Sequence, residues 1–94
     1  MTANRTLRIR IEGRVQGVAF RDWMERTAHS LGLTGWVRNS RDGSVEAVIS
    51  GDAALVEDML ELCRQGPPAA RVQDVAVVAE EDAAFAGFEI RPTA

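Results

Sequence analysis

The sequence predicts an α+β fold in a single domain spanning residues 1–94, and three observations lead to this expectation. Several segments alternate apolar and charged residues, which is typical of strands with one buried face. Two longer segments carry apolar residues at three- and four-residue spacing, which is typical of amphipathic helices. The elements follow the order β-α-β-β-α-β, which predicts the ferredoxin-like sandwich, a mostly antiparallel sheet with two helices on one face.

The first half of the chain is expected to hold a strand, a helix and two further strands. These elements are expected at residues 7–12, 20–31, 34–39 and 45–49. Gly32 stands where a left-handed C-terminal cap ends a helix, and Asp42-Gly43 is the signal of a tight hairpin. We expect residues 1–5 or so to form a flexible N-terminal arm.

The second half repeats this outline. Asp52 is a good N-cap for a helix that runs to Gln65, where the segment Gly66-Pro67-Pro68 stops it. A strand is expected at residues 71–79, and its alternation slips between Val72 and Val75, which indicates a bulge or a bend. A short strand at residues 88–90 is expected to complete the sheet.

This arrangement has a geometric consequence for function. The first and second strands run parallel with the third between them, so that their C-terminal ends reach the same edge of the sheet. Two strand spacings place these ends about 10 Å apart. The segment Gly13–Arg21 and the residue Asn39 can therefore meet over a small ligand.

Composition excludes several classes of function. The net charge of −3 disfavours bulk attraction to nucleic acid, and no apolar stretch approaches the ~20 residues of a membrane helix. All eleven basic residues are arginines, which excludes Schiff-base chemistry and a P-loop lysine. Because Cys63 is the single cysteine, an internal disulfide is impossible and a cytoplasmic setting is expected.

The usual nucleophiles, bases and metal ligands are poorly placed. His29, the single histidine, lies about 12 Å along its helix from Arg21, and Cys63 falls on the inner stripe of the second helix. No metal-ligand spacing is present, so we expect no metal site. Any chemistry must use arginine, amides and water.

The segment Gly13–Arg21 allows two interpretations. Its two glycines and the following helix start can form a concave anion site of main-chain N–H groups, with Arg21 as an additional donor. The alternative is an ordinary strand-to-helix turn with a solvated arginine. However, an arginine at a helix N-terminus opposes the helix dipole by about 0.3–1 kcal/mol, and a bound anion would remove this conflict.

Asn39 also allows two interpretations. Its neutral amide can orient a water molecule beside a bound phosphate without adding negative charge. On local sequence alone, the alternative of an asparagine that starts the hairpin is favoured.

Taken together, GRVQGVAFR, then GWVRN and SRDGSVEAVISG, resemble the acylphosphatase family over nearly the whole chain, and GPPAARV and FEIR fit the same pattern. The resemblance implies that Arg21 binds phosphate and that Asn39 orients the attacking water. It further implies a phosphate cradle of main-chain amides, formed by Arg14, Val15, Gln16, Gly17, Val18 and Ala19.

The implied activity is hydrolysis of acyl phosphates to a carboxylate and inorganic phosphate without metal or other cofactor. We expect a monomer by default. One alternative is a non-catalytic module that binds phosphate or carbamoyl phosphate, since similar domains occur inside larger enzymes. RNA binding is a second alternative for this fold. It is disfavoured because residues 7–12 and 45–49 contain no aromatic residue and the chain is acidic.

Overall fold

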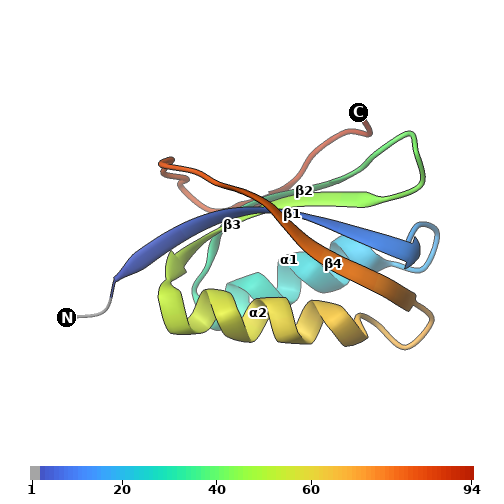
Figure 1. The fold of residues 1–94 in the computed structure, drawn as a ribbon, viewed down its shortest axis with the longest axis horizontal. Coiled ribbons are helices and arrows are strands. Elements are labelled where there is room, and N and C mark those ends of the chain that lie inside the picture. The colour runs from blue at the N-terminus through green and yellow to red at the C-terminus, as the bar shows by residue number, and fades with distance from the viewer. Residues whose placement is uncertain (1–2) are drawn as a thin grey trace.

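The computed structural model describes residues 3–94 and shows a two-layer α+β sandwich. Two helices cover one face of a five-stranded sheet (Figure 1). The elements are β1 (Asn4–Arg14), α1 (Phe20–Leu31), β2 (Thr34–Asn39), β3 (Val45–Asp52), α2 (Ala53–Gln65), β4 (Arg71–Glu80) and β5 (Phe88–Ile90).

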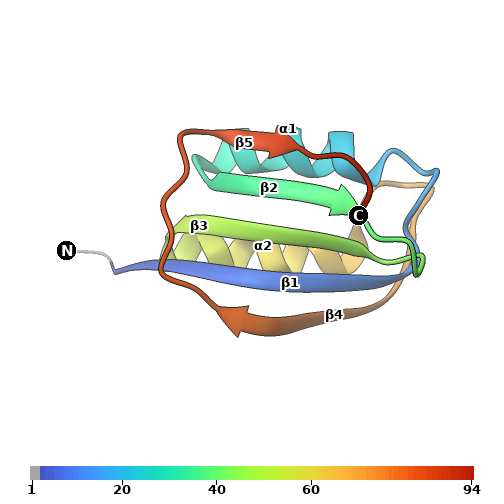
Figure 2. The same ribbon diagram turned by 90° about the horizontal axis from the view of Figure 1, so that it is seen from above.

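The sheet has the order β4-β1-β3-β2-β5 (Figure 2). Strands β1 and β2 both pair antiparallel with β3, so they run parallel to each other. The short strand β5 joins the far edge parallel to β2. The ferredoxin-like prediction is confirmed, and the C-terminal ends of β1 and β2 reach one edge of the sheet.

The core lies between the sheet and the helices. Leu7, Ile9 and Ile11 alternate along β1 toward the helices, and all three are buried. Met24 on α1 and Met59 on α2 are fully buried against them. Burial of each such side chain stabilises the fold by about 1.5–3 kcal/mol. This layer fixes the start of α1 relative to the sheet edge.

Most element boundaries agree with the sequence, and α1 ends at Gly32 in the expected left-handed conformation. The bulge in β4 is confirmed, since the register with β1 shifts between Glu12 and Gly13. However, β1 begins at Asn4 rather than at Leu7, because Asn4 and Arg5 pair with the end of β3. Residues 4 and 5 of the expected arm are therefore part of the sheet, and residues 1–2 lie outside the described residues.

Charged side chains lie on the outer face of the sheet, where Arg8 and Arg38 both form ion pairs with Glu46. Trp36 lies on this face, yet it is only 4% exposed. The guanidinium carbons of Arg8, Arg38 and Arg91 lie 5.3, 4.7 and 4.8 Å from its ring centre. These cation–π contacts cover the ring, so Trp36 has a packing role on the outer face of the sheet.

Candidate active site

The loop between β1 and α1 has an unusual backbone. Gly17 and Ala19 both adopt positive φ values, of 72° and 63°. Across residues 3–94, Ala19 is the one non-glycine residue with positive φ, and it is the N-cap of α1 without a side-chain capping bond. A left-handed alanine costs about 1–3 kcal/mol, a strain that clusters at functional sites.

The N–H groups of this loop are free to bind a ligand. Trp23 makes the first hydrogen bond of α1, from its N–H to the carbonyl oxygen of Ala19 (3.0 Å). The N–H groups of residues 16–22 donate to no acceptor in the described part of the chain. Free N–H groups in a loop and the positive end of a helix dipole together form a suitable site for an anion.

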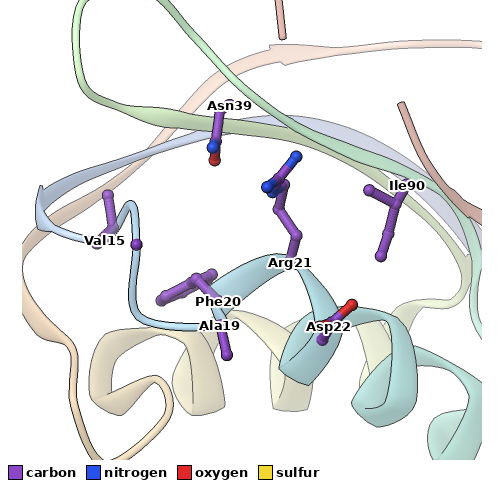
Figure 3. A pocket seen from close by; sticks show the side chains of 8 residues that line it. Val15, Ala19, Phe20, Arg21, Asp22, Asn39 and Ile90 are labelled. Carbon is purple, nitrogen blue, oxygen red and sulfur yellow. The ribbon is translucent and has the colours of Figure 1, made fainter. Parts of the chain in front are cut away.

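A cavity of about 180 Å³ lies between this loop and the end of β2. Figure 3 shows the side chains of Arg21, from α1, and Asn39, from β2, pointing into it from opposite sides. Arg21 is half-buried, and its guanidinium makes no ion pair or hydrogen bond with another described residue. A planar guanidinium without a protein partner is well suited to an incoming phosphoryl group.

Asn39 brings an unsatisfied acceptor to the same cavity. Its Oδ1 is buried and has no hydrogen-bond partner among the described residues. A buried acceptor left unpaired costs about 1–3 kcal/mol. The backbone of Asn39 is held well, since it pairs with Val45 of β3 and its carbonyl accepts a hydrogen bond from the N–H of Ala94 (3.0 Å).

Comparison with known proteins identifies the family. The acylphosphatase family model matches residues 7–90. The chain belongs to the acylphosphatase family. An acylphosphatase of a Nostoc species is 58% identical over 86% of this chain and 80% of its own length, and that of Rhodospirillum rubrum is 51% identical over 95% and 98%. The crystal structure of acylphosphatase from Bacillus subtilis superposes with a TM-score of 0.86, at 33% identity over 95% of this chain and 99% of that one.

The acylphosphatase fold brings only part of the expected set to the cavity. The expected residues that line it are Val15, Gly17, Ala19, Arg21 and Asn39. Three of the six expected cradle residues lie outside this lining. Arg14 is the exposed last residue of β1, Val18 packs against the core, and the side chain of Gln16 turns toward the hairpin.

Three residues that line the cavity were not expected from the sequence. Phe20 and Asp22 directly precede and follow Arg21 at the start of α1. Their position next to Arg21 in the sequence could have indicated that they line the same cavity. Ile90 lines the cavity from β5, opposite Val37 of β2. The contribution of Ile90 depends on which strand β5 joins, and no local pattern encodes that choice.

Two other reactive groups, the Cys63 thiol and the His29 imidazole, do not line the cavity. Burial raises the pKa of the Cys63 thiol to about 12, so the thiol stays protonated near neutral pH. His29 is exposed in the last turn of α1. In residues 3–94, no three His, Cys, Asp or Glu side chains cluster as metal ligands, and no helix has the length and apolar character to cross a membrane.

Proposed function

We propose that this protein hydrolyses acyl phosphates to a carboxylate and inorganic phosphate. One observation carries the proposal: free main-chain N–H groups, an unpartnered guanidinium on Arg21 and an unpaired acceptor on Asn39 surround one cavity. Membership of the acylphosphatase family and the names of the relatives support the same activity.

The phosphoryl group binds to Arg21 and to the main-chain amides of the loop between Arg14 and Ala19. These donors stabilise the negative charge that its equatorial oxygens carry in the transition state. Free amides and left-handed backbone at Gly17 and Ala19 support this role for the loop. Because preorganised donors need not reorient during the reaction, so small a set can be effective.

Asn39 holds the attacking water through its Oδ1, which accepts a hydrogen bond from the water. The new bond forms between the water oxygen and phosphorus, and the bond between phosphorus and the acyl oxygen breaks. A phosphate oxygen of the substrate takes the proton of the water. Since a carboxylate is a good leaving group, the reaction needs neither a metal ion nor a strong general acid.

Benzoyl phosphate hydrolysis in excess chelator, followed by absorbance, tests this function. The wild type is compared with Asn39→Ala and with Asn4→Ala, a control at the exposed start of β1. Asn39→Ala is expected to lower kcat about 10²–10³-fold, because an oriented water is lost, with inhibition by inorganic phosphate unchanged. Asn4→Ala is expected to retain the wild-type rate.

The opposite result favours the alternative function. A wild-type rate equal to that of buffer, with phosphate still bound in a calorimeter, refutes hydrolysis. The protein would then act as a binding module for phosphate or carbamoyl phosphate. A rate that disappears with chelator and returns with a metal ion refutes the metal-independent mechanism.

A further inference from the structure

The side chain of Gln16 connects the two halves of the proposed active site. Its Nε2 donates hydrogen bonds to the carbonyl oxygens of Ser40 (2.7 Å) and Ser44 (2.8 Å). We propose that Gln16 is a positioning residue that holds Asn39 in place through the turn of residues 40–44. This inference rests on the proposed function, in which Asn39 orients the attacking water.

The two acceptors of Gln16 stand at the base of that turn. The N–H of Ser40 donates to the carbonyl oxygen of Ser44 (2.9 Å), and the N–H of Gly43 donates to that of Ser40 (3.1 Å). Asp42 supports the turn from inside, since its Oδ1 accepts from the N–H of Ser44 (2.9 Å). The two hydrogen bonds of Gln16 come from outside the turn. They connect the base of the turn to the loop between β1 and α1.

Asn39 depends on this base for its position. Ser40 follows Asn39 directly, and Ser44 precedes Val45, the residue paired with Asn39 on β3. The Asn39 Oδ1 makes no hydrogen bond of its own to the described residues, so its place in the cavity follows from its backbone. Ala94 supports the other side of the turn, because its backbone oxygen accepts a hydrogen bond from the N–H of Arg41 (2.9 Å).

Gln16 therefore couples the phosphate loop to the water-orienting amide. Its backbone belongs to the loop that would hold the phosphoryl group, and its side chain fixes the turn that carries Asn39. The Gln16 side chain thus sets the distance between bound phosphorus and bound water. Displacement of a reacting group by about 1 Å can lower a rate 10²-fold.

A double-mutant cycle tests this role. Gln16→Met keeps the length of the side chain but removes both donors, and Gln73→Met is a matched control at an exposed position of β4. We expect Gln16→Met to lower kcat for benzoyl phosphate about 10–100-fold, with the inhibition constant of phosphate changed by less than about threefold. When Asn39 is already alanine, Gln16→Met should lower kcat by less than about threefold, because no oriented water remains to be displaced.

Three results would overturn the proposal. If Gln16→Met lowers kcat by the same factor in the wild type and in Asn39→Ala, then Gln16 acts independently of Asn39. A large rise in the inhibition constant of phosphate would place its effect on the phosphate loop instead. A lower melting temperature of Gln16→Met with unchanged kcat at 25 °C would show that the hydrogen bonds of Gln16 only stabilise the fold. Wild-type turnover, measured first, reports on the proposed function separately, since its absence overturns hydrolysis before any Gln16 variant is compared.

Discussion

Replacement of Arg21 by alanine should affect activity and stability in opposite directions. Arg21 stands in the first turn of α1, where the helix dipole disfavours a positive charge. It has no ion-pair or hydrogen-bond partner in the described part of the chain that would offset this conflict. The structure therefore gives Arg21 a cost to folding, which the proposed binding of a phosphoryl group would offset.

The magnitudes follow from the geometry of the site. Hydrogen bonds to charged groups contribute about 1.5–3 kcal/mol each, and a guanidinium can make two of them to a phosphoryl group. Loss of about 3–6 kcal/mol corresponds to a fall in kcat/KM of about 10²–10⁴-fold. The same substitution should raise the free energy of unfolding by about 0.3–1 kcal/mol, since the charge leaves the helix start.

Benzoyl phosphate turnover and urea denaturation measure the two effects on the same samples. Arg26→Ala serves as the control, because Arg26 is exposed one turn further along α1 and lines no part of the cavity. We expect that control to keep the wild-type kcat/KM. A clear loss of stability in Arg21→Ala would refute the reasoning, since it would mean that the fold needs the guanidinium without a ligand.

Three further changes test the strain, the charge of the cavity and the outer face of the sheet. Ala19→Gly should raise the free energy of unfolding in urea by about 0.5–1 kcal/mol, because glycine adopts positive φ without strain; a loss would contradict strain at Ala19. Asp22→Asn should lower the inhibition constant of phosphate about two- to fivefold by removing a like charge from the cavity, and an unchanged constant would contradict this. Burial raises the pKa of Glu46, but hydrogen bonds from Arg38 and Arg8 outweigh burial and hold that pKa below its ordinary 4.5. Stability from this group is thus present above pH 4.5 and is lost as the pH falls through the lower folded-state value, so Glu46→Gln should flatten acid unfolding followed by circular dichroism.

Locally encoded features could be predicted from the sequence. The bounds of α1 follow from apolar spacing and from Gly32, which adopts the left-handed conformation at its end. The slip of alternation between Val72 and Val75 marks a real shift of register in β4. Arg21 and Asn39 could be placed at one edge of the sheet because the element order alone determines which strand ends meet.

Features that depend on distant partners could not be predicted. Asn4 extends β1 only because the end of β3 lies beside it, and no alternation marks this extension. Ile90 reaches the cavity only because β5 joins β2. The hydrogen bonds of Gln16 span 24 and 28 residues, and an alanine gives no sign that its backbone will be left-handed at position 19.

Three features that destabilise the described fold lie close together. Strain at Ala19, an uncompensated charge on Arg21 and a buried, unpaired oxygen on Asn39 all border the same cavity of about 180 Å³. Elsewhere, comparable groups are compensated, as where Arg8 and Arg38 both bind Glu46 on the outer face of the sheet. Because each cost destabilises the protein alone, their proximity points to a functional role for this cavity. In the proposed reaction, a phosphoryl group supplies negative charge for the guanidinium and acceptors for the loop amides, and the attacking water supplies the donor that the asparagine oxygen lacks.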